Sequence, residues 1–376
     1  MKIPFADIKR QYHSMKTEVH EAINEVLNDT AFIRGKYVSR FEENFSKMYG
    51  VKNVVGVGNG TDAIYLALRA LNIGPGDEVI TVCNSWISTS EVIGQVGASV
   101  KFIDIESDNY NIDVNLIEKE ISEKTKAIIP VHLYGQMCEM DKIMQIASKH
   151  NLKVIEDCAQ SHGATYKNKK AGSIGDVGCY SFYPTKIFGA YGDGGFITTN
   201  NEELFDRMKR IRFLGMEKKK MSSGHWNGKY YAIEHGTNSR LDEVHAAILL
   251  KKFPYLDEWI DRRRQIAARY NDELKNQNID LPLEHPDNKH AYYIYVVANP
   301  ERDRIMTSLS KKNIHLNISY PWPIHIMDAY KHFVCSSCNC MPITEQRANE
   351  IFSLPMYPTL SDDEQDTVIK ELKKLI

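Results

Sequence analysis

Apolar residues between about residue 52 and residue 200 follow two alternating patterns. Short β-rich runs are separated by stretches with helical spacing, and turn signals such as Gly74-Pro75-Gly76-Asp77 fall between them. The predicted strands are 54–57, 78–82, 100–105, 127–131, 153–156, 178–182 and 195–199. The predicted helices are 62–71, 88–95, 114–121, 140–150 and 202–213. Strands separated by such helices predict parallel units and an α/β domain with a mostly parallel sheet covered on both faces.

The pattern differs on either side of this region. Residues 14–49 are predicted to be helical, ending at Tyr49-Gly50. After about residue 250, two long charged helices at 256–274 and 362–375 bracket alternating runs at 291–298 and 313–320, with a proline-stiffened loop between the runs at 321–325. This predicts a large domain over 1–250 and a smaller α+β domain over 251–376. Ligands in such folds lie at the carboxyl ends of parallel strands and between domains.

Composition narrows the class of protein. The 376 residues are 43% hydrophobic and 26% charged, and the formal net charge is -2. Near-neutrality disfavours binding to nucleic acid or anionic membranes through bulk charge. No apolar run approaches the roughly 20 residues of a membrane span, and an acid lies where a signal peptide would carry its apolar core. We therefore expect a cytoplasmic protein with no nucleic-acid or membrane partner.

The seven cysteines agree with a reducing compartment. Four of them lie in or beside apolar strand-like segments and are predicted to be reduced core thiols: Cys83, Cys138, Cys158 and Cys179. A tighter group, Cys335-Ser-Ser-Cys338-Asn-Cys340, offers three thiolates, but no second Cys or His pair follows at finger-like spacing. A loop with reduced thiols is favoured over a metal site, and no metal is predicted.

One lysine has an unusual setting. Lys186 lies between Ser181-Phe-Tyr-Pro-Thr185 and the glycine-rich Gly189-Ala-Tyr-Gly-Asp-Gly-Gly195, just before a predicted strand. A lysine held by its backbone in a concave, partly dry place can lose a proton near neutral pH and attack a carbonyl to form a Schiff base. A lysine between such residues more often has no catalytic function. The rest of the chain must therefore show whether Lys186 is functional.

A glycine-rich turn follows the first predicted strand. Gly56-Val-Gly-Asn-Gly60-Thr61 is a near miss for the dinucleotide fingerprint, because Thr61 occupies the third glycine position. Small residues at a helix N-terminus also form a phosphate cradle through free backbone N–H groups. The alternative is a turn with Asn59 or Thr61 as N-cap, and the two interpretations are compatible.

Two further residues lie at predicted strand ends. Asp157 follows a buried strand, where a carboxylate needs a cation or several donors. The alternative is that Glu156 or Asp157 caps the next turn. Trp86, after the second strand, could stack on a planar ring, although core packing is the commoner role of an aromatic residue.

Together these residues describe one ligand. A phosphate cradle, a flat aromatic, a strand-end carboxylate and an activated lysine are what pyridoxal 5'-phosphate requires. The lysine binds the cofactor as a Schiff base, and the carboxylate keeps the ring nitrogen protonated.

The chain also resembles the DegT/DnrJ/EryC1/StrS family of nucleotide-sugar aminotransferases, which have the fold-type I aminotransferase architecture. The resemblance runs over nearly the full length. It is carried by Asn59-Gly-Thr-Asp62, Gly74-Pro-Gly-Asp-Glu-Val79, Pro130-Val-His-Leu-Tyr-Gly-Gln136, Glu156-Asp-Cys-Ala-Gln160, Ser181-Phe-Tyr-Pro-Thr-Lys186, Gly192-Asp-Gly-Gly195 and Asn238-Ser-Arg-Leu241.

The resemblance implies a role for each matching position. Lys186 would be the Schiff-base lysine and proton shuttle. The cofactor contacts would be Asp157 to the ring nitrogen, Gln160 to the ring hydroxyl, Trp86 stacked on the ring, and Gly60, Thr61 and Ser181 around the phosphate. Asn238 would reach the phosphate from a partner subunit, so that a homodimer shares its active sites. Tyr183, Arg240 and His325 are assigned to the substrate or to the donor carboxylate.

The expected reaction transfers the amine of L-glutamate, which leaves as 2-oxoglutarate, to the ketone of a nucleotide-linked sugar by way of the pyridoxamine form. The Tyr183-Pro-Thr-Lys186 pattern, together with Gly192-Asp-Gly-Gly195, resembles family members that act at C3, and this favours C3 of a dTDP-3-keto-6-deoxyhexose. A C4 ketone and a UDP-3-keto sugar are the alternatives. Ile187-Phe188 and the bulky Trp86 depart from the usual family residues and weaken the assignment of the sugar. A catalytically idle regulatory relative and a nicotinamide dehydrogenase remain open.

Overall fold

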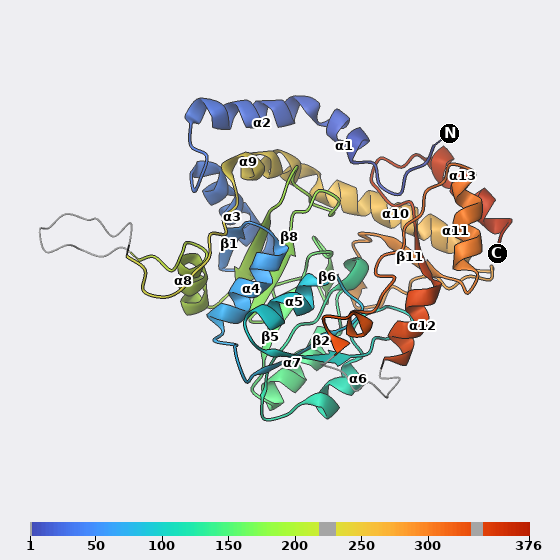
Figure 1. Cartoon of the computed structure of the whole chain (residues 1–376). Coiled ribbons are helices and arrows are strands. Elements are labelled where there is room, and N and C mark those ends of the chain that lie inside the picture. The colour runs from blue at the N-terminus through green and yellow to red at the C-terminus, as the bar shows by residue number, and fades with distance from the viewer. Residues whose placement is uncertain (1, 218–230, 332–340) are drawn as a thin grey trace, which may run out of the picture.

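The computed structural model describes residues 2–217, 231–331 and 341–376. Its centre is a seven-stranded sheet in the order β1-β9-β8-β5-β4-β2-β3 (Figure 1). The strands are β1 (Asn53–Val57), β2 (Glu78–Val82), β3 (Ser99–Ile103), β4 (Thr125–Ile128), β5 (Lys153–Asp157), β8 (Val177–Ser181) and β9 (Gly195–Thr199). Only β9 runs antiparallel to its two neighbours in this sheet, so the predicted mostly parallel α/β sheet is confirmed.

Alternation along the strands explains why both faces of the sheet are covered. Val54 and Ile80 pack into one hydrophobic cluster, whereas their neighbours Val55 and Val79 pack into another on the opposite face. Helices α4 (Gly60–Ala70), α5 (Ser88–Gln95) and α8 (Glu202–Ile211) supply the second cluster. Helices α3 (Lys36–Tyr49), α7 (Met140–Lys149) and α9 (Glu243–Lys252) supply the first. The carboxyl ends of the parallel strands are thereby left for a site.

The N-terminal helical region is broken where one continuous pattern was predicted. The predicted segment 14–49 forms α2 (Lys16–Asp29) and α3, which are separated at Thr30, a left-handed residue with φ 51°. A further helix that was not predicted, α1 (Ile8–Ser14), precedes them. The break turns the chain so that α3 packs on the sheet. Gly50, also left-handed, ends α3 where the sequence predicted it. The predicted helix at 114–121 is α6 (Val114–Ile117) followed by the 3-10 helix η1 (Glu118–Glu120).

The C-terminal part has its own hydrophobic cluster. Its strands β11 (Tyr295–Ala298) and β12 (Ile351–Leu354) pair antiparallel. Its helices are α10 (Leu256–Leu274), α11 (Arg302–Ser310), α12 (Pro342–Glu350) and α13 (Asp362–Lys373), with the 3-10 helices η4 (Phe253–Tyr255) and η5 (Ile324–Ile326). The remaining elements are η2 (Leu133–Gly135) and a small sheet of β10 (Asn288–Lys289), β6 (Thr165–Tyr166) and β7 (Lys169–Lys170).

The predicted alternating run at 313–320 is not a strand. It makes isolated bridges from Ile314 to Ile3 and from Asn317 to Ser353, and the chain then bends into the loop before η5. The beginning of the chain therefore packs on the C-terminal cluster, and the letters N and C lie on the same side of the molecule in Figure 1.

Helix α10 belongs to two clusters. Its first part packs with the sheet through Leu256 and Ile260, and its later part packs with β11 through Ile266 and Tyr270. The predicted division at 250/251 falls just before this helix and stays a prediction. Among the described residues, no helix combines the length and apolar character needed to cross a membrane. The cysteine group at 335–340 lies outside the described residues.

Candidate active site

Two helix N-termini and a strand end meet at one edge of the sheet. Asn59 caps α4 by accepting a hydrogen bond from the Asp62 N–H at 2.8 Å, which confirms one of the two predicted caps. A Cβ on Gly60 would lie 2.7 Å from the Ser181 Cβ, so glycine allows α4 to approach the end of β8. The Thr61 Oγ1 lies 2.7 Å from the Oγ of Ser88, the first residue of α5. The hydroxyls and the positive N-terminal end of α4 favour a phosphate here.

Asp157 ends β5 beside this edge. Its side chain is 6% exposed and accepts hydrogen bonds from the Thr89 Oγ1 at 2.8 Å and the Ala159 N–H at 3.1 Å. No arginine or lysine pairs with it within the described residues. Burial raises the pKa of Asp157 against the opposing effects of Thr89, Ala159 and the charge of Lys186. A buried carboxylate with two donors and no ion-pair partner suits a cationic ligand nitrogen.

Gln160 is held at both ends of its amide. Its Oε1 accepts from the Tyr134 N–H at 2.9 Å, and its Nε2 donates to the Tyr320 hydroxyl at 2.5 Å. The Tyr134 and Tyr320 rings stack at 6.3 Å between centroids. The second Nε2 proton is left for a ligand oxygen. Trp86, which directly precedes the first turn of α5, is 61% exposed rather than packed in the core.

Lys186 lies on the loop between β8 and β9. Its N–H donates to the Tyr183 carbonyl at 2.9 Å, which fixes the turn, and its Nζ lies 4.6 Å from the centroid of the Tyr293 ring. The side chain is half-buried. Nearby His162 is fully buried with no partner for either ring nitrogen. Burial, together with the charge of Lys186, lowers the pKa of His162 to about 3, so this imidazole is neutral.

The predicted residues of the 238–240 segment lie near the start of α4. Ser239 accepts from the Gly58 N–H at 2.9 Å and donates to Asp62 at 2.5 Å, and the neighbouring Asn238 is exposed. The Arg240 guanidinium lies 5.6 Å from the centroid of the Phe213 ring. Tyr183, on the loop between β8 and β9, is 54% exposed.

His325 comes from the C-terminal part of the chain. It is 6% exposed, its Nε2 lies 3.0 Å from the Glu345 Oε1, and its Nδ1 is buried without a partner. The preceding Ile324 N–H donates to the Cys83 carbonyl at 2.9 Å, which fastens η5 to the end of β2. His325 therefore lies at the strand edge with an acid already bound to it.

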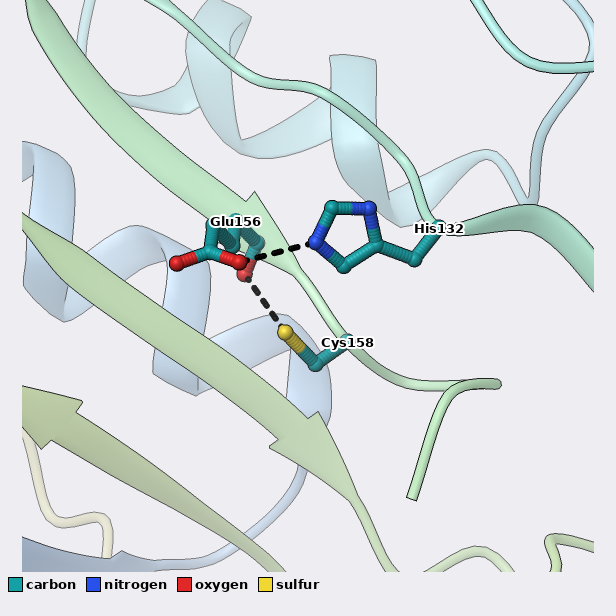
Figure 2. Close-up of side chains that lie close together, drawn as sticks. All are labelled: His132, Glu156 and Cys158. Atoms are coloured by element: carbon teal, nitrogen blue, oxygen red, sulfur yellow. Dashed lines mark hydrogen bonds and ion pairs between the residues drawn. The ribbon is translucent and has the colours of Figure 1, made fainter. Parts of the chain in front are cut away.

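A second polar cluster consists of His132, Glu156 and Cys158, which lie close together (Figure 2). The Glu156 carboxylate is bonded by His132 Nε2 at 2.9 Å and by the N–H groups of Gly172, Ile174 and Gly175 at 2.9, 2.8 and 2.6 Å. His132 Nδ1 accepts the Cys138 N–H at 3.2 Å, which leaves the proton on Nε2. Burial raises the pKa of Glu156, but these donors outweigh it and the pKa is lowered.

Cys158 completes that group, and its sulfur lies 3.6 Å from the Glu156 carbonyl. His132, Glu156 and Cys158 are close enough to hold a metal ion. Their lone pairs and protons are instead used within the chain, so we interpret the cluster as a structural anchor. Cys83, Cys138, Cys158 and Cys179 are free and buried, as predicted.

Sequence reasoning missed four contributors to this edge: Ser88, Thr89, Tyr134 and Tyr320. Ser88 and Thr89 follow Trp86 so closely that the same motif could have indicated them. Tyr320 reaches Gln160 from 160 residues away, and no local pattern predicts that contact.

The family model of the DegT/DnrJ/EryC1/StrS aminotransferase family matches residues 13–373. A dTDP-3-amino-3,4,6-trideoxy-alpha-D-glucose transaminase from Micromonospora megalomicea subsp. nigra is 41% identical over 97% of this chain and 96% of its own. A dTDP-3-amino-3,6-dideoxy-alpha-D-galactopyranose transaminase from Aneurinibacillus thermoaerophilus is 43% identical over 99% of both chains. A relative named pleiotropic regulatory protein, from Geobacillus stearothermophilus, is 40% identical over 99% of this chain and 98% of its own.

Solved structures agree over the whole fold. DesV of S. venezuelae, in complex with a ketimine intermediate, has a TM-score of 0.94 and 34% identity over 100% of this chain and 98% of its own. NtdA from Bacillus subtilis, with bound cofactor PMP, has a TM-score of 0.89 and 32% identity over 99% of this chain and 84% of its own.

Proposed function

Because this chain belongs to the DegT/DnrJ/EryC1/StrS aminotransferase family, we propose that it transfers the amino group of L-glutamate to the keto carbon of a nucleotide-linked sugar, with pyridoxal 5'-phosphate as cofactor. The observation that carries the proposal is the convergence of three groups on one strand edge. They are the underpaired carboxylate of Asp157, the cradle at Gly60, Thr61 and Ser181, and the amine of Lys186.

These residues fit the cofactor on their own chemistry. A cradle of first-turn N–H groups and hydroxyls suits its phosphate, and Asp157 suits its ring nitrogen. Gln160 keeps one amide proton for the ring hydroxyl, and the exposed face of Trp86 suits the ring. When bound, the cofactor supplies an electron sink for the carbon that loses or gains the amine.

Within that frame the chain's own groups have distinct roles. Lys186 is held by the turn at Tyr183, and its Nζ moves the proton at the substrate carbon. Asp157 holds a proton on the ring nitrogen in a site from which water is largely excluded. Thr89 and Ala159 fix the direction of that carboxylate.

The identity of the sugar is a finer proposal. We favour C3 of a dTDP-3-keto-6-deoxyhexose, on the Tyr183-Pro-Thr-Lys186 pattern and on the dTDP-3-amino-sugar transaminases among the relatives. A C4 ketone and a UDP-3-keto sugar are the alternatives. Tyr183, Arg240 and His325 are proposed to contact the substrate.

We also propose a homodimer with shared sites, located in the cytoplasm. The exposed Asn238 beside the start of α4 suits a side chain that contacts the phosphate of a second subunit's site. Exposed Phe32 and Ile33 offer apolar surface for such an interface.

A regulatory relative without catalysis is the second candidate, favoured by the name of one 40% identical relative. The test is glutamate-dependent amination across a panel of dTDP- and UDP-linked 3-keto and 4-keto sugars, with Lys186→Ala as control. We expect one dTDP-3-keto sugar to be aminated by the wild type and not by the variant. Cofactor binding without amination of any sugar would support the regulatory alternative.

A further inference from the structure

A cavity of about 240 Å³ lies beside Lys186 and is separate from the cradle. Three distant parts of the chain line it: the N-terminal segment around Asp7, the loop between β8 and β9 that carries Lys186, and the C-terminal part through residues such as Ser319 and Thr359. The volume exceeds the roughly 30 Å³ of a single water, and it is below the roughly 300–1,000 Å³ typical of pockets for larger ligands. A small organic ion matches it better than a nucleotide sugar.

Arg263 is the unusual residue in the cavity wall. It is 5% exposed, and its Nη1 donates to the carbonyls of Tyr292, Tyr293 and Met356 at 3.2, 2.9 and 3.0 Å. Its Nε is buried without any partner. Over the described ranges, no carboxylate pairs with this guanidinium. Buried charges in proteins are normally paired, so this guanidinium suits an anionic ligand.

The neighbouring arginines sharpen the contrast. Arg262 pairs with Asp362 at 2.7 Å and Arg264 pairs with Glu284 at 2.6 Å, and both are more exposed than Arg263. Consecutive positions on α10 thus give two arginines with an acid and one without. The one without is the one that lines the cavity.

The acid within the cavity wall does not supply the missing partner. Asp7 caps α1 by accepting the Arg10 N–H at 2.8 Å, and its other oxygen lies 3.3 Å from the Arg10 Nε. The positive charges in the cavity wall are those of Lys186 and Arg263. Tyr293 links them, because its ring faces the Lys186 Nζ and its carbonyl accepts from Arg263.

We propose that this cavity binds the amino donor, with Arg263 holding one of its carboxylates beside Lys186. The inference rests on the proposed function, since it gives the glutamate of that reaction a place. A guanidinium binds a carboxylate through charge-assisted N–H bonds. The polar residues Ser319, Thr359 and Asn317 also line the cavity. The side of the site near Gly60 and Thr61 then remains for the nucleotide sugar. His325 is a weaker candidate for binding the donor carboxylate, because it already contacts the Glu345 carboxylate.

The test uses glutarate, a dicarboxylate with no amine to transfer, titrated calorimetrically into the cofactor-loaded enzyme. We expect Arg263→Gln to raise the Kd for glutarate about 10- to 100-fold, as expected for loss of a charge-assisted pair. Arg263→Lys keeps the positive charge but lacks the planar guanidinium, and it should give an intermediate increase in the Kd for glutarate. Arg264→Gln is the matched control and should change the Kd less than about twofold. Unchanged glutarate binding in both Arg263 variants overturns the proposal.

A measurement on the wild-type enzyme covers the case in which the variants do not fold. Glutarate should protect Arg263 from an arginine-specific dicarbonyl reagent, read by peptide mass spectrometry, and should leave Arg264 unprotected. Lack of protection at Arg263, or equal protection by sulfate at matched ionic strength, overturns the assignment to the donor. Normal glutamate KM in Arg263→Gln overturns the Arg263 site alone. A wild-type enzyme that binds glutarate and aminates no keto sugar overturns the proposed function alone.

Discussion

Glu156 and Asp157 are adjacent carboxylates at the end of one strand, and their surroundings differ in kind. Glu156 receives four hydrogen bonds from the chain, and its pKa is lowered. Asp157 receives two, and burial raises its pKa. Both are buried, so burial alone does not separate them. A saturated carboxylate serves the fold, whereas an underpaired one beside a free amine is built for a ligand.

The largest effect should come from removing the amine of Lys186, whose charge acts on Asp157. Lys186→Ala should lower turnover by at least about 10²–10⁴-fold, since proton transfer alone contributes that much. It should also abolish the absorbance band of the lysine-bound cofactor while the melting temperature of the cofactor-free protein stays nearly unchanged, because the side chain is only half-buried. Activity that persists in this variant contradicts the assigned role.

The next test changes Asp157, the carboxylate proposed to bind the ligand. Asp157→Asn should lower turnover about 10²–10³-fold, the range seen when one preorganised electrostatic group is removed. Its free energy of unfolding without cofactor, from urea denaturation at pH 7, should not fall. The pKa of Asp157 is raised on folding, so its ionised form destabilises the fold above that pKa, and a neutral amide removes the penalty. A marked fall in the free energy of unfolding would indicate that Asp157 stabilises the fold, as Glu156 does, and would contradict its role in ligand binding.

On the structural side, Glu156→Gln should show the opposite profile. We expect a loss of about 3–5 kcal/mol in the free energy of unfolding, since the amide cannot accept from all four donors and leaves buried groups unpaired. Asp157→Asn is the matched control one residue away.

The pH dependence gives a second readout for Glu156. Its pKa is lowered in the folded state, so its stabilisation is complete above the unfolded value and is lost as pH falls through the folded value. The stability gap between wild type and Glu156→Gln should therefore shrink on acidification below about pH 4, near the unfolded pKa of a glutamate. A gap that widens there would contradict the assignment.

The smallest expected effect comes from Thr89→Val, which removes one of the two donors to Asp157. A hydrogen bond to a charged group contributes about 1.5–3 kcal/mol, and the bound ring cation should offset part of that loss. We expect turnover to fall about tenfold or less, with the acid limb of its pH profile moved to higher pH as the carboxylate loses a stabilising donor. If the acid limb does not move, the hydrogen bond from Thr89 does not control the ionisation of Asp157.

Local patterns predicted much of this arrangement from the sequence. The seven strands of the sheet follow from apolar runs, and Gly60, Asp157 and Lys186 lie at their carboxyl ends, as such folds require. The run at 313–320 has the alternation of a strand but finds only isolated bridges, because pairing depends on a partner that the pattern does not reveal. The break at Thr30 was hidden because helical periodicity continues on both sides of it.

The two carboxylates could not be told apart from the sequence. Glu156 and Asp157 are neighbours in one motif, and their donors come from segments as far away as Thr89 and Gly175. The burial of Arg263 could not be predicted from the sequence either. Arg263 lies in a charged helix, which is typical of a solvated surface, but three carbonyls from other segments accept hydrogen bonds from its side chain.

The most direct measurement of the central claim is the absorbance spectrum of the purified protein between about 320 and 430 nm, the range of the cofactor chromophore. The account predicts a band near the long-wavelength end that shifts toward shorter wavelength when glutamate is added, and that is absent in Lys186→Ala. A protein with no such band after incubation with pyridoxal phosphate, or with a band that glutamate leaves unmoved, would contradict it.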